Sequence, residues 1–339
     1  MLGCISALIG LLFKVVVIVC ILCAVRWVLD RIPIGNIANR PVLITGCDWG
    51  FGHELALKLL TNEVPVYATC LTKKGEQALQ EKAANLPGKL QTLIVDVTDQ
   101  RSVDSALEQI EADTNSLWGV VNNAGLFCVA VPDEWLSIAD YERCLAVNAL
   151  GVIRVSHAFA RLVKRAHGRI VTMTSVAGRV AVPHFGPYTV AKFAAEGYCD
   201  TLRVELAPFG VSVSIVEPGV FKTPTLDLAQ IEAGVDRAWE ALSDDKKHEY
   251  GKEFHEQSKV AHRKLVNDLA SDDIRPVVTA YYQALFSRFP RARYHVGLDA
   301  KFFFVPLSML PTELADWLFK MFTRLQKPPT PAGALVGAH

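Results

Sequence analysis

The sequence has no excess of charge of either sign, because 35 Lys and Arg residues balance 35 Asp and Glu residues in a chain of 339. A nucleic-acid-binding protein needs a positive surface, so this balance argues against that class of partner. Charged residues make up 21% and hydrophobic residues 51%, which excludes an intrinsically disordered chain. No internal repeat, no low-complexity tract and no Asn-x-Ser/Thr sequon occurs, so nothing in the sequence indicates a glycosylated, lumenal surface.

Cysteine is present without a repeated spacing. Cys20 and Cys23 lie within an apolar stretch, where a metal or redox site is not expected. We therefore predict free thiols in a reducing compartment for the eight cysteines, at positions 4, 20, 23, 47, 70, 128, 144 and 199.

Charge is scarce near the start of the sequence, where residues 2–25 contain only Lys14. As a helix this stretch is about 36 Å long, enough to cross a hydrocarbon core of ~30 Å. We predict a membrane anchor helix over residues 1–29; a cleaved signal peptide, which needs an early basic region, and a buried core helix are the alternatives. Arg26, Arg31 and Arg40 follow the stretch and predict a cytosolic main domain. We expect the membrane to be that of the endoplasmic reticulum.

Strand and helix patterns alternate after residue 40. Short apolar runs predict buried strands, and the segments between them have helical spacing. This alternation predicts an α/β fold, a Rossmann-type doubly wound parallel sheet forming one catalytic domain over residues 38–300. The predicted strands are 41–45, 64–70, 90–95, 117–121, 169–175, 211–217 and 293–296, and the predicted helices are 51–60, 74–85, 99–113, 140–166, 188–207 and 273–286.

Two segments depart from this alternation. Residues 224–270 are polar with helical spacing, and we predict a helical insertion that forms a substrate lid. Residues 301–339 form a tail in which the predicted helix 311–327 places Leu314, Trp317, Leu318, Met321, Phe322 and Leu325 on one face. Such a face suits either contact with a membrane surface or packing on the domain or a partner subunit, and the predicted anchor favours the membrane.

Glycines follow the first predicted strand in the run Thr45-Gly46-Cys47-Asp48-Trp49-Gly50-Phe51-Gly52. Glycines at a strand-to-helix turn allow the backbone to approach a pyrophosphate, and the helix N-terminus faces the negative charge. The spacing differs from Gly-x-Gly-x-x-Gly, so the position after the first strand carries most of the argument.

Tyr188 and Lys192 are four residues apart and share one helix face. An ammonium beside a phenol favours the phenolate and lowers the tyrosine pKa, so Tyr188 is a candidate general acid and base. Ser175 ends the fifth predicted strand, and Asn148 lies within the long helix. Strand ends of this kind point into the ligand crevice of a parallel sheet.

Together these residues resemble the short-chain dehydrogenase/reductase family over roughly residues 40–225. Further segments resemble the branch that holds retinol dehydrogenases, hydroxysteroid dehydrogenases and 3-hydroxybutyrate dehydrogenase. The matching family motifs are Thr45-Gly46-x3-Gly50-x-Gly52, Asn122-Asn-Ala-Gly125, Asn148, Ser175 and Tyr188-x3-Lys192, and the branch segments are Leu117–Gly125, Val163–Arg169, Glu217–Thr223 and Arg293–Gly297.

The resemblance implies a role for each residue. Tyr188 takes the substrate hydroxyl proton, Ser175 hydrogen-bonds the reacting oxygen, and Lys192 lowers the Tyr188 pKa and binds the nicotinamide ribose. Asn148 holds a water that links Lys192 to solvent. Asp96 is implied near the adenine, Asn122 near the ribose and Thr223 near the carboxamide, and the implied cofactor-binding set also contains Thr45, Gly46, Asp48, Gly50, Phe51, Gly52, Val97, Ala124, Gly125, Tyr188, Lys192, Pro218 and Gly219.

The choice between NAD and NADP depends on the end of the second strand. An acid there binds the ribose 2′-hydroxyl of NAD and an arginine favours NADP, but this chain has Thr69-Cys70-Leu71-Thr72. Asp48 would repel a 2′-phosphate, whereas Lys73 and Lys74 would attract one. Because Asp48 lies within the glycine loop, we predict NAD and leave NADP open.

The anchor, the apolar tail and the lid predict a lipophilic alcohol, such as a retinol or a hydroxysteroid, as substrate. A 3-hydroxybutyrate-type dehydrogenase is the alternative within the family, and a non-catalytic cofactor-binding scaffold is the alternative outside it. No metal site is predicted. The resemblance also implies a homodimer through the helices that begin near Asp140 and Tyr188.

Overall fold

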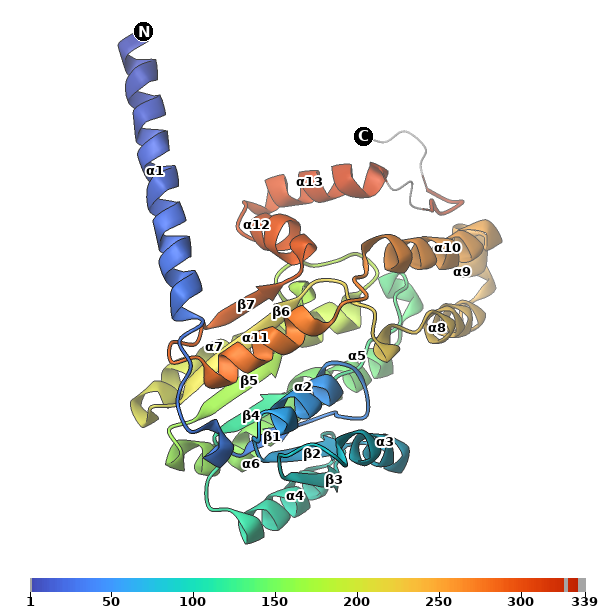
Figure 1. The fold of residues 1–339 in the computed structure, drawn as a ribbon. Coiled ribbons are helices and arrows are strands. Elements are labelled where there is room, and N and C mark those ends of the chain that lie inside the picture. Colours follow the sequence, from blue (N-terminus) through green and yellow to red (C-terminus); the bar gives the residue numbers. More distant parts are fainter. Residues whose placement is uncertain (1, 326–328, 335–339) are drawn as a thin grey trace.

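Seven parallel strands form a single sheet in the order β3-β2-β1-β4-β5-β6-β7 (Figure 1). The structure is a computed structural model that describes residues 2–325 and 329–334. The strands are β1 (Val42–Ile44), β2 (Val66–Cys70), β3 (Leu90–Ile94), β4 (Gly119–Asn122), β5 (Arg169–Met173), β6 (Ser212–Pro218) and β7 (Arg293–Val296). The predicted parallel Rossmann-type sheet is therefore confirmed.

Helices cover both faces of this sheet, which explains why its strands are almost continuously apolar. One face is covered by α2 (Gly50–Thr61), α3 (Lys73–Ala83) and α11 (Arg275–Phe286). The other is covered by α4 (Gln100–Asp113), α6 (Val152–Arg165) and α7 (Gly186–Leu206). Neighbouring residues of β1 point into the two cores, Val42 and Ile44 into the first and Leu43 into the second.

The carboxyl ends of the strands meet at one edge of the sheet. Strand β1 pairs with β2 on one side and with β4 on the other. Strands β2 and β3 are added outward on one side of β1 and strands β4 to β7 on the other, so the strand order reverses between β1 and β4. Open α/β sheets bind ligands in the crevice outside such a reversal. The site described below is built from the loops at this edge.

The helix predicted over residues 140–166 is continuous but not uniform. It consists of α5 (Ile138–Leu145), the π-helical segment η3 (Ala146–Gly151) and α6. A π-helical turn is wider than an α-helical one and is frequent at functional sites. Asn148 lies in this turn.

The predicted insertion is helical, as expected. It contains the short turn η6 (Pro224–Leu226) and the helices α8 (Leu228–Glu240), α9 (Asp244–Tyr250) and α10 (Lys252–Leu269). Its aromatic side chains pack around Trp135, in the turn η2 (Asp133–Trp135), which belongs to the segment between β4 and α5. The remaining short turns are η1 (Ile37–Asn39), η4 (Val176–Gly178) and η5 (Ala207–Phe209).

Helix α1 (Leu2–Leu29) projects away from the domain, as Figure 1 shows. Its apolar side chains are exposed where they are described, with 55% of Ile18 and 62% of Leu22 accessible. The base of α1 is attached to the domain through Asp30, which accepts a hydrogen bond from Arg291 Nε at 2.9 Å.

The segment over residues 300–325 lies on the same side of the molecule as α1 (Figure 1). It contains η7 (Ala300–Phe304), α12 (Val305–Leu307) and α13 (Thr312–Leu325). Leu314, Trp317 and Met321 of α13 are exposed. Residues 326–328 and 335–339 of the predicted tail lie outside the described residues.

Among the described residues, one helical stretch is long and apolar enough to cross a membrane, residues 138–165. Half of it is buried inside the domain, as is usual for a core helix. The described part of α1 from Val17 to Leu29 counts only as a shorter apolar helix.

Candidate active site

The glycine loop after β1 is fastened to the loop after β4. Thr45 Oγ1 accepts hydrogen bonds from the backbone N–H groups of Asn123 and Ala124, each at 3.0 Å. Asn123 Nδ2 donates to the carbonyl oxygens of Thr45 and Gly46, each at 2.9 Å. The turn is thus fixed before any ligand arrives.

Two glycines in this turn are required by close approach. Gly46 has a φ of +70°, and a Cβ on it would lie 2.7 Å from Ala124 Cα. A Cβ on Gly52 would lie 2.4 Å from Asn123 Nδ2. Gly50 also has a positive φ, and Thr223 is its nearest neighbour. Any larger residue at positions 46 or 52 would push the two loops apart.

Helix α2 begins directly in this turn, and its N-cap residue Trp49 makes no side-chain capping bond. The N–H groups of the first turn of a helix have no partner within the helix and carry partial positive charge. An N-terminus of this kind, at the end of a glycine turn, suits the pyrophosphate of a dinucleotide. Phe51 packs edge-on against Phe221 at the start of the same helix.

Asp48 connects the glycine loop to the end of β2. Its carboxylate accepts hydrogen bonds from the backbone N–H groups of Leu71 at 2.8 Å and Thr72 at 2.9 Å, and from Thr72 Oγ1 at 2.7 Å. The sequence has no acidic residue at the end of β2, but the fold places the carboxylate of Asp48 there. Lys73 is paired with Glu76 at 3.0 Å.

The ends of β3 and β4 contribute the next residues. Asp96 caps its own turn, because its Oδ1 accepts from Thr98 N at 2.8 Å, and Val97 is buried beside it. Asn122 Nδ2 donates to Ser156 Oγ at 2.9 Å, while Asn122 Oδ1 is buried without a partner in the described part of the chain. A buried acceptor without a donor is costly, so it suits a ligand hydroxyl.

Ser175, Tyr188 and Lys192 are brought together as predicted. Ser175 follows β5, and its hydroxyl lies close enough to Tyr188 to lower the pKa of the phenol. Lys192 Nζ lies 5.4 Å from the centre of the Tyr188 ring and donates to the Met173 carbonyl oxygen at 3.1 Å. Ser175 lies in the loop after β5, and Tyr188 and Lys192 lie in the first two turns of α7, at the carboxyl edge of the sheet.

Burial dominates the electrostatics of this group. It raises the pKa of Tyr188 to about 12, against the opposing effect of the Ser175 hydroxyl. It lowers the pKa of Lys192 to about 8, against the opposing charge of Glu196. Burial thus outweighs Ser175 in the pKa of Tyr188, and the lowering that we expected from Lys192 stays a prediction.

Glu196 lies one turn after Lys192 and belongs to a buried ion network. Burial and the neighbouring Glu217 raise the pKa of Glu196 to about 7. Arg293 of β7 bridges Glu196, Glu217 and Asp200. The network ties α7 to β6 and β7 behind the group of Ser175, Tyr188 and Lys192.

Asn148 is 1% exposed and is held by the loop after β4. Its Oδ1 accepts from Leu126 N at 3.0 Å, and its Nδ2 donates to Leu126 O at 2.9 Å. Gly125 separates it from Lys192: a Cβ on Gly125 would lie 2.9 Å from Asn148 Oδ1 and 3.8 Å from Lys192 Nζ.

The end of β6 closes the site on the opposite side. Pro218 O accepts from Ser175 Oγ at 3.5 Å. A Cβ on Gly219 would lie 2.0 Å from Asp299 Oδ2, which accepts from Val220 N at 2.8 Å. Thr223 faces the glycine loop near Gly50.

The ring of Tyr188 packs against Phe127 and against the buried cluster of Cys128, Cys144 and Ala191. Phe127 lies 5.3 Å from the Tyr188 ring and 5.3 Å from the Phe185 ring, measured between centres. His262 of α10 is buried, and burial followed by the proximity of His184 lowers its pKa to about 4. His262 is therefore neutral near pH 7.

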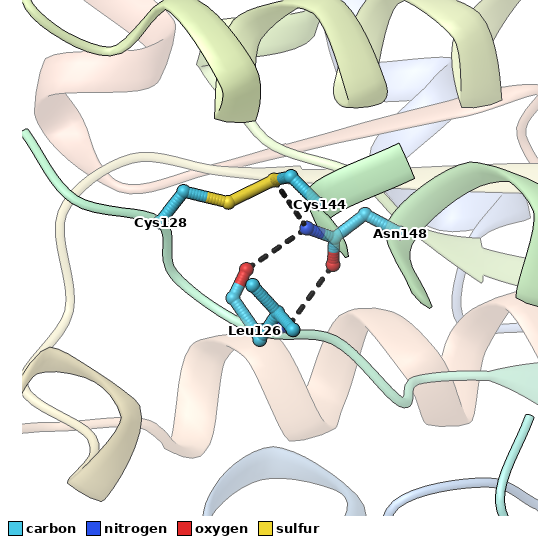
Figure 2. Close-up of a disulfide and its surroundings, with 4 residues drawn as sticks. All are labelled: Leu126, Cys128, Cys144 and Asn148. Carbon is cyan, nitrogen blue, oxygen red and sulfur yellow. Dashed lines mark hydrogen bonds between the residues drawn. A yellow bond between two sulfur atoms is a disulfide. The ribbon is translucent and has the colours of Figure 1, made fainter. Parts of the chain in front are cut away.

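The prediction that all eight cysteines are free thiols is wrong for two of them. Cys128 and Cys144 form a disulfide (Figure 2). They lie 16 residues apart without a recognisable motif, and they meet because the loop after β4 folds over α5. Cys20, Cys23, Cys47, Cys70 and Cys199 are free.

Four residues of the site were not singled out from the sequence. Asn123 was only part of a motif, although its side chain joins the two loops and accepts from Tyr281 at 2.9 Å. Asp299 and Phe127 carry no sequence signal, because their roles depend on segments far apart in the chain. Tyr281 lies in an apolar helix pattern that predicts core packing.

A family model described as short chain dehydrogenase matches residues 40–232. The 3beta-hydroxysteroid dehydrogenase dhs-16 of Caenorhabditis elegans is 44% identical over 334 residues, which cover 95% of this chain and 86% of that protein. Retinol dehydrogenase 7 of Rattus norvegicus is 38% identical over 289 residues, which cover 85% of this chain and 90% of that protein.

Among solved structures, a short-chain dehydrogenase from Streptomyces avermitilis superposes with a TM-score of 0.64 at 23% identity. The match covers 85% of this chain and 97% of that one. At this level of identity the likeness supports the fold alone.

Proposed function

Because the chain belongs to the short-chain dehydrogenase family, we propose that it oxidises a lipophilic alcohol, a retinol or a hydroxysteroid, to the aldehyde or ketone. The protein is an oxidoreductase, and its reaction transfers a hydride between an alcohol carbon and a nicotinamide cofactor. The names of two relatives, a 3beta-hydroxysteroid dehydrogenase and a retinol dehydrogenase, support this substrate class. The observation that carries the proposal is the grouping of Ser175, Tyr188 and Lys192, with the aromatic ring of Phe127 packed on Tyr188.

Each of the four side chains has a role that its position supports. Tyr188 exchanges the proton of the substrate oxygen, and the hydroxyl of Ser175 beside it orients that oxygen. Lys192 contributes a positive charge beside the phenol when it is protonated, which stabilises the phenolate. Asn148 lies across Gly125 from Lys192, so its amide is the next polar side chain beyond the ammonium.

The cofactor supplies the hydride chemistry, and the chain supplies its binding and orientation. The uncapped N-terminus of α2 suits the pyrophosphate, and the unpaired Oδ1 of Asn122 suits a ribose hydroxyl. Asp48 at the end of β2 favours NAD over NADP, because a carboxylate repels a 2′-phosphate. The pairing of Lys73 with Glu76 weakens the attraction that Lys73 would offer to NADP.

Two alternatives remain from the sequence. A 3-hydroxybutyrate-type enzyme binds a small anion, whereas the contact of Phe127 with the Tyr188 ring favours an apolar substrate. A non-catalytic scaffold would not need the buried and hydrogen-bonded arrangement of Asn148, Ser175, Tyr188 and Lys192. Alcohol-dependent formation of NADH would exclude the scaffold.

We also propose that α1 anchors the protein in a membrane, that of the endoplasmic reticulum, and that α13 lies on its surface. The exposed apolar side chains of both helices support this arrangement. The two indications of sidedness conflict: Arg26, Arg31 and Arg40 favour a cytosolic domain, whereas a disulfide persists better in an oxidising lumen. Protease protection in sealed microsomes distinguishes these sides.

The deciding experiment assays a panel of retinols, hydroxysteroids and 3-hydroxybutyrate with NAD and with NADP. Tyr188→Phe should lower kcat by at least ~10³-fold and leave the Kd of the cofactor within about twofold, because only the exchangeable proton is lost. Tyr282→Phe, the same change on α11, should retain full activity. Substantial turnover by Tyr188→Phe, or a preference for 3-hydroxybutyrate, would contradict the proposal.

A further inference from the structure

The Cys128–Cys144 disulfide lies next to Asn148, as Figure 2 shows. Cys128 belongs to the segment after β4, and Cys144 lies on α5, one helical turn before Asn148. Cys128 is 5% exposed and Cys144 is fully buried, so the bond is enclosed between the segment and the helix. Nothing in the reaction chemistry proposed above uses these sulfur atoms.

The disulfide and the Asn148 amide make contact with the same short segment. Asn148 exchanges two hydrogen bonds with the backbone of Leu126, two residues before Cys128. Asn148 Nδ2 also donates to Cys144 Sγ at 3.3 Å. A closed ring results, in which the covalent bond joins segment and helix on one side and the amide joins them on the other (Figure 2).

Two contacts join this segment to the candidate active site, and both are made by residues next to the disulfide. Leu126 fixes the amide of Asn148 in the wide turn of η3, and Phe127 packs on the Tyr188 ring. No helix or strand covers residues 123–132, so regular backbone pairing does not hold the segment in place. The disulfide is the one covalent restraint on it.

We propose that the Cys128–Cys144 disulfide positions Asn148 and Phe127 for the reaction, which makes both cysteines positioning residues. This inference rests on the proposed function, because it takes Asn148 and Tyr188 as parts of the active site. With the bond intact, Leu126 stays in register with the Asn148 amide. Without it, the segment samples positions in which the amide loses its backbone partners.

Three variants separate the bond from the sulfur atoms. Cys128→Ser breaks the bond and leaves Cys144 Sγ beside Asn148. Cys144→Ser breaks the bond and places a hydroxyl there. We expect each variant to lower kcat by about tenfold, and the double variant to be no slower than either single one, because all three lose the same bond.

The kinetic pattern distinguishes positioning from a loss of stability. The KM for the cofactor should stay within about twofold of wild type, since the glycine loop is untouched, while the pH profile of kcat should change with the environment of Asn148. Leu162 is fully buried on α6, so Leu162→Ala is a control for lost stability. It should lower the melting temperature but keep the wild-type kcat and pH profile. Additive losses in the double cysteine variant would overturn the proposal.

Two further measurements complete the test on the full-length, detergent-solubilised protein. Alkylation of the unfolded, unreduced protein should leave Cys128 and Cys144 unmodified, and labelling of both would overturn the inference. Asn148→Ala serves as the reference. If it is inactive while the cysteine variants match wild type, the positioning role fails and the proposed function stands. If it is fully active, the role of Asn148 in the proposed function fails as well.

Discussion

Tyr188 and Lys192 are both buried in ways that favour their neutral forms. The pKa of Tyr188 is raised to about 12 and that of Lys192 is lowered to about 8. Near pH 7 the pair therefore holds a neutral phenol beside an ammonium. This combination is ready to give a proton to a carbonyl oxygen, whereas alcohol oxidation must first form the phenolate.

These pKa values predict different pH profiles for the two directions. Oxidation should become faster from about pH 6 to about pH 8, because the phenolate fraction grows, and should level off above that, because the loss of charge on Lys192 offsets the further growth of the phenolate. Reduction needs the phenol, so it should be level below about pH 8. Initial rates in both directions across this range provide the test.

Lys192→Arg is the matched control for this profile, because a guanidinium keeps its charge throughout the range. In this variant the rate should continue to rise above about pH 8 and not level off, even if its overall rate is lower. If the rate still levels off, another group must cause it.

Several of these residues could be identified before the fold was known, and others could not. Gly46, Ser175, Tyr188 and Lys192 occur in a fixed order relative to the strands, so sequence spacing places them at one edge of the sheet. Cys128 and Cys144 follow no such rule, because their contact depends on how an irregular segment folds over α5. We expected free thiols because we predicted a reducing compartment, and that argument does not tell which cysteines lie close together in the fold.

At the scale of elements, the alternation of strands and helices predicted the sheet well, because buried parallel strands are continuously apolar. The π-helical turn η3 was not predicted, since its apolar spacing resembles that of an ordinary helix. In this turn Asn148 makes hydrogen bonds to the backbone of Leu126, 22 residues away, and no local sequence pattern predicts such a contact.

Helix α10 of the insertion should loosen in acid. Burial, followed by His184, lowers the pKa of His262 to about 4 from a usual 6.5, while the nearby Glu232 acts in the opposite direction. As the pH falls below about 6.5, the unfolded chain takes up a proton that the folded chain resists, so folding stability decreases until about pH 4. Melting temperatures at about pH 7 and about pH 5 measure this loss.

His262→Gln should reduce the pH dependence, because the amide does not titrate. His248→Gln, on the exposed surface of α9, should leave it unchanged. Equal pH dependence in wild type and His262→Gln would show that His262 is not the responsible group.

For the whole molecule, the notable feature is that two apolar helices lie outside the sheet on the same side (Figure 1). The base of α1 is not loosely connected, because Arg291 holds Asp30 and Pro33 pairs with Ser287. A domain attached in this way has a restricted orientation relative to α1. If α1 is embedded in a bilayer, α13 is directed toward the same surface.

This arrangement predicts two separable contributions to membrane binding. Deletion of residues 2–29 should weaken binding to phospholipid vesicles, and the further change of Trp317 and Met321 to serine should abolish it, because both side chains are exposed on α13. Flotation with vesicles measures both steps. Val260→Ser on α10 removes a similarly exposed apolar side chain and should have no effect. Full binding after both changes would contradict a membrane role for α13.

The Cys128–Cys144 bond also acts on the chain when it is unfolded. Closing a loop across a separation of 16 residues removes conformational entropy from the unfolded ensemble, worth about 3 kcal/mol in the chain-entropy model. Leu126 and Asn148 are 22 residues apart along the backbone, yet the bond leaves a much shorter path between them. The bond thus turns a distant contact of the candidate site into a nearly local one, which costs the chain less entropy to form.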